Sequence, residues 1–184
     1  MPNRSLLLLV LSLGCAPSYE CQDPLWTAGT CEAATVVSLP DRGNDHVAED
    51  LDVDHEDSPP ASGSHYGGWA KYGEYSGLVP ERWVHNLEHG ALVILHHPCA
   101  SDALVEELRA FAKGQADDDG GDFRWILTPY PDLDSAFALV TWQWTFSSEC
   151  FDGVEAQAFV AEHYRTAPED VPADGAFSTG WIAE

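Results

Sequence analysis

Basic residues are scarce in this chain. Eight Lys and Arg stand against 31 Asp and Glu, which gives a formal net charge of −23 at pH 7. Nucleic-acid binding needs clustered Lys and Arg that displace counterions from the phosphates, and anionic lipid headgroups attract the same residues. The composition therefore excludes nucleic acid as a partner, and it favours the accumulation of cations near the surface of the protein.

Several catalytic motifs are missing too. The sequence has no Gly-x-Ser-x-Gly elbow, no glycine-rich phosphate loop and no Cys-x-x-Cys pair, so neither nucleophilic nor nucleotide chemistry nor a zinc ribbon is indicated. Asp50, Asp52 and Asp54 alternate as in a calcium loop. However, His55 and Ala61 stand where that loop needs Gly and Glu. We therefore interpret this segment as a solvated acidic loop.

The apolar run at residues 6–11 is too short to anchor a chain in a bilayer. It follows Arg4 and leads to a junction of small residues that ends at Cys15, which is the layout of a secretory signal peptide. We predict that residues 1–14 are a signal peptide that is removed on export. The junction also resembles the bacterial lipobox, which implies an acylated Cys15 that anchors the protein to a membrane. We expect the protein in the periplasm or on the outer face of a membrane.

Four cysteines follow the lipobox, and an even number in an exported chain usually means disulfide bonds. Three connectivities are open to them, and we favour Cys21 with Cys31 and Cys99 with Cys150. The first bond would close a loop within residues 15–44, which lack sustained periodicity and are predicted to form a tether. The second would join two segments that we place in or beside the same sheet.

Hydrophobic periodicity predicts a single α+β domain over residues 45–184. We expect a small, largely antiparallel sheet with helices on one side, preceded by the long N-terminal tether. A helix over 80–89 begins with Pro and Glu, and Gly90 can supply the left-handed residue that ends it. The remaining helices are predicted at 103–113 and 154–165, and the strands at 91–97, 124–128 and 137–146.

Four histidines fall in loops or at the ends of elements: His46, His65, His85 and His89. Two of them, His85 and His89, are four residues apart and share one face of the predicted helix. Small residues around His65 allow its loop to approach closely. Imidazole suits Zn²⁺ and Cu²⁺, so we predict a metal site with His65, His85 and His89 as ligands and His46 as the fourth. Glu88 is a candidate ligand, an acceptor that orients a ligand, or a general base.

Metal binding requires neutral histidine, so the affinity should fall as the pH drops through about 6. The other histidines are expected outside the site. His96 and His97 end the strand at 91–97, whereas His55 and His163 are predicted to be surface groups.

Several segments of the sequence resemble a bacterial family, the domain of unknown function 3105. They are the Pro-Pro-Ala-Ser-Gly-Ser-His-Tyr loop within 58–66, the aromatic and glycine run at 69–75, the Val-His-Asn-Leu-Glu-His-Gly string at 84–90, His46 with Val47, and the Ala-Pro-Glu string at 167–169. The resemblance covers roughly residues 45–170 and implies exported or membrane-anchored placement. It supplies no reaction, and it makes four residues the family's signature histidines: His46, His65, His85 and His89.

The interpretation that we favour is an exported lipoprotein domain that binds Cu or Zn through histidines and acts in metal handling or envelope function. Its expected partners are the metal ion and, through the lipid anchor, a membrane. The sequence indicates no particular protein partner.

A zinc-dependent hydrolase is one alternative, because His85, Glu88 and His89 form an His-x-x-Glu-His string. In that chemistry both histidines bind zinc, the glutamate is the general base, and a distant residue is the third ligand. Glu155 or Glu162 in the last predicted helix could serve as that ligand.

A second alternative is a metal-independent binding or assembly module of the envelope. Four aromatic residues among glycines could form a surface for a glycan or a protein: Tyr66, Trp69, Tyr72 and Tyr75. Exposed rings at Trp69 and Tyr72 would favour this module, whereas rings buried around clustered imidazoles would favour the metal site.

Overall fold

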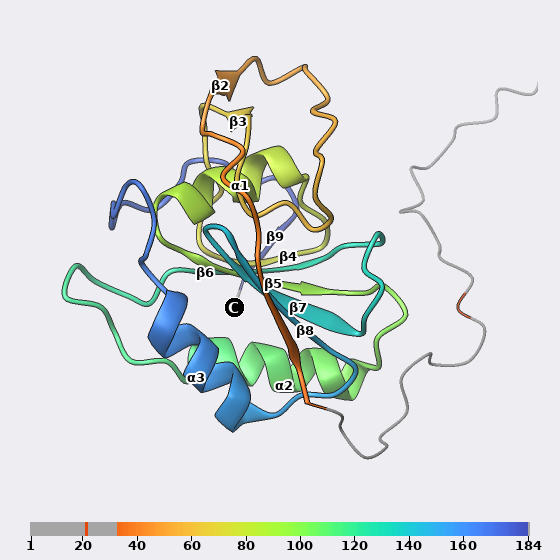
Figure 1. Cartoon of the computed structure of the whole chain (residues 1–184). Coiled ribbons are helices and arrows are strands. Elements are labelled where there is room, and N and C mark those ends of the chain that lie inside the picture. The colour runs from red at the N-terminus through yellow and green to blue at the C-terminus, as the bar shows by residue number, and fades with distance from the viewer. Residues whose placement is uncertain (1–20, 22–32, 184) are drawn as a thin grey trace, which may run out of the picture.

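A computed structural model describes Cys21 and residues 33–183 of the chain. The predicted signal peptide, the lipidation site Cys15 and the disulfide candidate Cys31 lie outside the described residues. The described part forms one domain built on a seven-stranded mixed sheet, in the order β1-β8-β7-β5-β6-β4-β9 (Figure 1). A separate two-stranded sheet pairs β2 with β3.

The main sheet is mostly antiparallel. Only the neighbours β5–β6 and β4–β6 run parallel, and the other four pairs are antiparallel. The α+β class and the largely antiparallel sheet are therefore confirmed. The strands are β1 (Thr35–Ser38), β2 (His46–Val47), β3 (His65–Tyr66), β4 (Gly73–Tyr75), β5 (Leu92–His96), β6 (Trp125–Pro129), β7 (Phe137–Thr141), β8 (Trp144–Ser148) and β9 (Trp181–Ile182).

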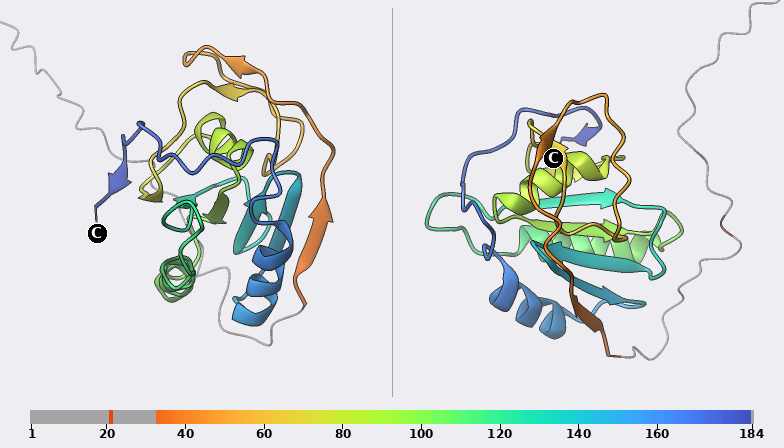
Figure 2. Two further views of the ribbon diagram at one scale, coloured as in Figure 1. Left: turned by 90° about the vertical axis from the view of Figure 1, so that its left-hand side faces the viewer. Right: turned by 45° about the horizontal axis from the view of Figure 1, so that its top comes forward.

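In the part of the chain that the structure describes, three helices cover the two faces of the main sheet: α1 (Pro80–Glu88), α2 (Asp102–Lys113) and α3 (Gly153–His163). Alternate residues of β5 point to opposite faces. Val93 and Leu95 join the core under α1, whereas Leu92 and Ile94 join the core under α2 and α3. We expected all helices on one side of the sheet. The structure has α2 and α3 together on one face and α1 on the opposite face (Figure 2). Both faces of β5 are thus buried, which explains its unbroken apolar run.

Within the described residues, no helix combines the length and the apolar character that a membrane span requires.

The predicted strand at 137–146 is in fact a hairpin. Strands β7 and β8 pair antiparallel, and the chain reverses at Trp142 and Gln143, where Gln143 adopts a φ of 64°. Left-handed turn positions of this kind usually carry Gly, Asn or Asp. Here the turn has none of these, and Trp142 is buried. The apolar alternation therefore continues through the turn, and periodicity alone shows no break.

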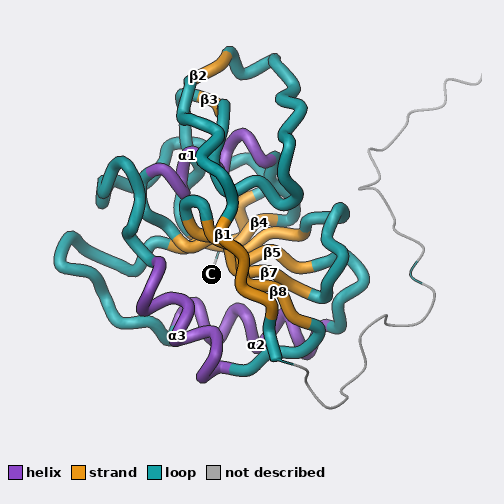
Figure 3. The backbone as a smooth tube through the Cα atoms, viewed as in Figure 1, coloured by secondary structure: helices purple, strands orange, loops and turns teal. Residues whose placement is uncertain are grey.

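Strand β1 lies within the segment that we predicted to be a tether. Its residues, Thr35–Ser38, pair antiparallel with β8 and form an edge of the main sheet (Figure 3). All four residues are exposed, so backbone hydrogen bonds hold this strand and the burial of side chains contributes little. An exposed edge strand has no apolar alternation to reveal it, and the predicted boundary at residue 45 falls too late for the sheet.

The predicted disulfide pairing is wrong. Cys21 is bonded to Cys99, 78 residues away in the sequence, and Cys150 is also disulfide-bonded. The bond therefore joins Cys21 to a residue shortly after β5 instead of closing a local loop. Two cysteines can form a disulfide bond only when the fold brings their Cα atoms close together, and here these atoms are 5.5 Å apart. The separation of the cysteines along the chain does not reveal that distance.

Replacing Leu139 by Ala tests the sheet as the centre of the core. Leu139 lies on β7 and is 0% exposed, so we expect the free energy of unfolding to fall by about 2–5 kcal/mol in a denaturant titration. The matched control is Val154→Ala in α3. Val154 is 81% exposed, and its truncation should change the free energy of unfolding by no more than about 0.5 kcal/mol. Equal losses for the two variants would contradict this core.

Candidate metal centre

The C-terminal end of helix α1 carries His85 and Glu88 in its last turn, and His89 follows directly. The helix begins with Pro80 and ends at Glu88, with His89 as the C-cap residue. Gly90 follows with a φ of 85°, as predicted for the residue that ends this helix. A β-carbon at Gly90 would lie 3.1 Å from the backbone of Arg165. Both the conformation and the close packing therefore require glycine here.

The two-stranded sheet of β2 and β3 brings His46 close to α1. His46 and His65 are direct partners in the parallel pair of β2 and β3, and the backbone N–H of His65 donates to the carbonyl of Asp45 at 3.0 Å. Their rings lie 5.0 Å apart between centroids, and each is 4.8 Å from the ring of His85. Residues far apart in the sequence thus form one cluster.

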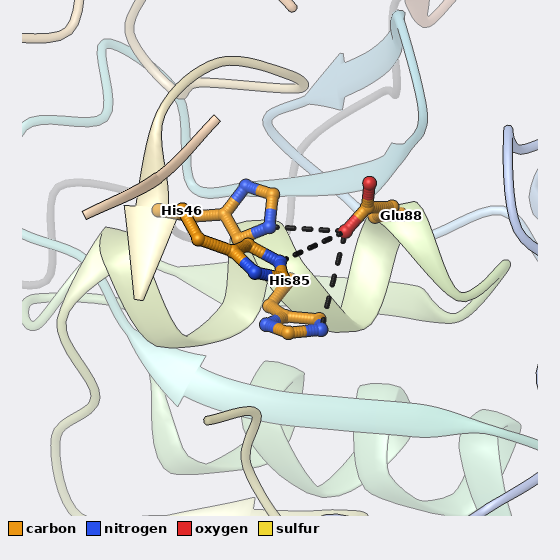
Figure 4. Close-up of side chains that lie close together, drawn as sticks. His46, His85 and Glu88 are labelled. Atoms are coloured by element: carbon orange, nitrogen blue, oxygen red, sulfur yellow. Dashed lines mark hydrogen bonds and ion pairs between the residues drawn. The ribbon is translucent and has the colours of Figure 1, made fainter. Parts of the chain in front are cut away.

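Glu88 lies at the centre of this cluster. Its Oε2 atom is 3.0 Å from Nε2 of His65, 3.7 Å from Nε2 of His46 and 3.9 Å from Nε2 of His85. Figure 4 shows the carboxylate facing the rings of His46 and His85. One ligand atom from each of the four residues lies within 4.8 Å of all the others. Such a group can hold one metal ion.

Backbone carbonyls orient two of the imidazoles. Nδ1 of His65 is 2.8 Å from the Gly63 carbonyl, and Nδ1 of His85 is 2.7 Å from the Tyr66 carbonyl. A carbonyl oxygen only accepts hydrogen bonds, so Nδ1 of each ring carries the hydrogen. In the neutral ring, Nε2 then carries no hydrogen and has a free lone pair. Metal-binding histidines in proteins are typically held in this way.

The lone pair on His65 Nε2 faces a carboxylate oxygen at 3.0 Å, an unfavourable contact unless a cation lies between the two atoms. That cation is either a proton or a metal ion. The other oxygen of Glu88, Oε1, accepts a hydrogen bond from Asn44 Nδ2 at 2.5 Å. This bond leaves Oε2 as the oxygen that faces the imidazoles.

Burial differs sharply between the members of the cluster. His65, His85 and Glu88 are almost completely buried, whereas the side chain of His46 is 54% exposed. His46 is therefore the member of this group through which solvent reaches the centre.

His89 lies at the edge of this group and does not belong to it. Its Nε2 is 3.2 Å from Nε2 of His85 and 3.3 Å from Oε2 of Glu169. Together, Glu88, His89 and Glu169 form a second group whose ligand atoms lie within 4.8 Å of one another. Glu169 was not predicted as a ligand. The Ala-Pro-Glu string of the family resemblance was the only signal that pointed to it.

The aromatic residues of the 66–75 segment pack inward. Trp69 is half-buried, with its ring 5.0 Å from the ring of His85 and 4.5 Å from that of His89. Tyr66 and Tyr75 are buried, and the partly buried Tyr72 packs against the core. These rings do not form the open aromatic surface of the metal-independent alternative.

The distant ligands proposed for a zinc hydrolase are not at the site. Glu155 accepts a hydrogen bond from the backbone of Ala34, and Glu162 lies beside His163. Neither glutamate belongs to a group of ligands in the described part of the chain. Both glutamates are far from the cluster because α3 packs on the face of the sheet opposite to α1. Positions along the sequence do not show on which face a helix packs.

The remaining histidines are also outside the cluster, but one of them is not a surface group. His163 is 6% exposed, and its ring stacks on Trp144 at 4.2 Å. The prediction that it lies at the surface is wrong because the last turn of α3 faces β8. His55 is half-buried, with its Nε2 enclosed, and His96 is half-buried at the end of β5.

The fold and the cluster define an α+β domain with histidines around a buried glutamate. Residues 46–179 match the model of a family described as "Protein of unknown function (DUF3105)". The match covers most of the chain, so the protein belongs to this family, and the resemblance inferred from the sequence is confirmed. No curated protein and no solved structure matches the chain.

Acid should destabilise the metal-free protein through His89. Burial, followed by the neighbouring His85, lowers the pKa of His89 from 6.5 to about 4. Between these values the unfolded chain binds a proton that the folded protein does not, so the free energy of unfolding falls as the pH drops from 6.5 towards 4. The loss is on the order of a few kcal/mol.

Denaturant titrations of the chelator-treated protein from pH 7 to 4 measure this loss, and His89→Gln should reduce the slope. An identical slope in the variant would show that other groups cause the acid sensitivity.

Proposed function

We propose that the protein is an extracytoplasmic lipoprotein, anchored through Cys15, whose domain binds a transition metal ion, copper or zinc, in metal handling or envelope function. One observation carries the metal-binding part of the proposal. One ring nitrogen from each of three histidines and a carboxylate oxygen of Glu88 lie within 4.8 Å of one another. The ligands are His46, His65, His85 and Glu88.

The types of ligand support copper or zinc. Three imidazoles and one carboxylate form a nitrogen-rich set, which suits Zn²⁺ and Cu²⁺, whereas Mg²⁺ and Ca²⁺ prefer oxygen ligands. Thiolate competes poorly here, because Cys21, Cys99 and Cys150 are tied up in disulfide bonds.

Electrostatics support a cation at the same position. The Glu88 carboxylate is 2% exposed, and the ion pairs that the structure describes for it are with imidazoles. Burying a carboxylate is costly unless a positive charge compensates it. A metal ion supplies that charge while the histidines stay neutral, as metal binding requires.

The accessibility of the ligands supports metal handling more than hydrolysis. Four protein ligands complete the coordination of zinc, and a hydrolytic site needs an open position for water. His46 is the exposed ligand, and it comes from a two-residue strand. An ion can therefore exchange with solvent or a partner through displacement of His46.

Metal content tests the proposal directly. The untagged protein, purified from its exported compartment, should contain at least one equivalent of zinc or copper by elemental analysis. His65→Gln and His85→Gln each remove a ligand, so the affinity in calorimetric titrations should fall by at least roughly 10- to 100-fold. His96→Gln is the matched control and should bind like the wild type. If the wild type binds neither Zn²⁺ nor Cu²⁺ at neutral pH, the proposal fails.

The anchor has a separate test. Mass spectrometry of the mature N-terminus should show an acylated Cys15, and fractionation should place the protein in the membrane. Cys15→Ser should move it to the soluble exported fraction, because the acyl chains hold the protein on the membrane. An unmodified N-terminus at another residue would refute the anchor and leave the metal site untouched.

A further inference from the structure

A second set of ligands lies next to the first. Glu88, His89 and Glu169 form their own group, with ligand atoms within 4.8 Å of one another. Nε2 of His89 is 3.3 Å from Oε2 of Glu169. Glu88 belongs to both groups. We propose that this centre binds two metal ions, with the Glu88 carboxylate shared between them; the inference rests on the proposed metal-binding function.

One ion cannot use all of these ligands. A zinc ion in a protein typically takes four ligands at about 2.0–2.2 Å, whereas six side chains surround this centre: His46, His65, His85, Glu88, His89 and Glu169. With Glu88 shared, the first ion also has His46, His65 and His85 as ligands. The second ion has His89 and Glu169. Paired metal ions in proteins are about 3.5–4 Å apart. The two groups of ligands are in direct contact, because Nε2 of His85 and Nε2 of His89 are 3.2 Å apart.

The second group is held in place from outside. The backbone N–H of Glu169 donates to the Glu88 carbonyl at 3.1 Å. The buried Arg124 donates to the carbonyl of His89 at 2.6 Å and pairs with Asp170 at 2.8 Å. Arg165 also binds Asp170. These contacts place the carboxylate of Glu169 beside His89 in a preformed arrangement.

The two groups differ in chemistry. The first is rich in nitrogen and mostly buried, whereas the second has two carboxylates, and the side chain of Glu169 is 53% exposed. Nδ1 of His89 is buried with no hydrogen-bond partner among the described residues. His89 therefore lacks the carbonyl contact that orients His65 and His85. The second ion should bind more weakly and exchange faster than the first.

Stoichiometry distinguishes this proposal from the first one. Metal-free wild-type protein, titrated with Zn²⁺ by calorimetry, should bind two equivalents with distinct affinities. Glu169→Gln removes a charged ligand of the second ion only, so it should bind one equivalent with the higher affinity unchanged. Glu162→Gln is the matched control, because Glu162 is an exposed glutamate on α3 outside both groups. The control should bind two equivalents.

Electron paramagnetic resonance gives an independent measurement of the same centre. Two Cu²⁺ ions about 3.5–4 Å apart couple magnetically, so the wild type loaded with two equivalents should show a half-field signal that Glu169→Gln lacks. If the wild type binds one equivalent and Glu169→Gln matches it, the second site is refuted and the proposed function stands. If the wild type binds no metal at all, both proposals fail.

Discussion

The contact between the buried carboxylate of Glu88 and the imidazoles around it is the constraint on which this centre depends. A carboxylate with 2% exposure is stable only when its charge is compensated. Two separate segments meet that need: the β2–β3 pair, which supplies His46 and His65, and α1, which supplies His85. The Gly63 and Tyr66 carbonyls orient His65 and His85 towards the acid. The β2–β3 sheet and helix α1 are therefore arranged around a single buried carboxylate.

The large sheet supports this arrangement without contributing ligands. Helix α1 packs on it through Trp83, Val84 and Leu87, which are completely buried. The opposite face of the sheet carries α2 and α3 and takes no part in the site. Arg124 precedes β6 and links the core to the site, because it binds the carbonyl of His89 and the side chain of Asp170. Core packing and the position of the ligands are thus coupled through one buried guanidinium group.

Local signals in the sequence were reliable where a physical cause acts within one element. Proline in the first turn and Gly90 after the last turn bound α1, and the apolar run predicts β5. Signals failed where the cause is distant. The hairpin at Trp142 and Gln143 contains no Gly, Asn or Asp, and β1 is held mainly by its backbone pairing with β8. The disulfide between Cys21 and Cys99 depends on a proximity that only the fold creates.

The sequence by itself determined the family, the α+β class and the identity of the histidines that gather at the site. These follow from residue types and short spacings, such as the four residues between His85 and His89 on one helix. Only the tertiary structure decided that Glu88 lies at the centre, that His89 falls into a second group, and that Glu169 completes that group. The reason is physical, since the mutual distances of ligands from different segments depend on how those segments pack.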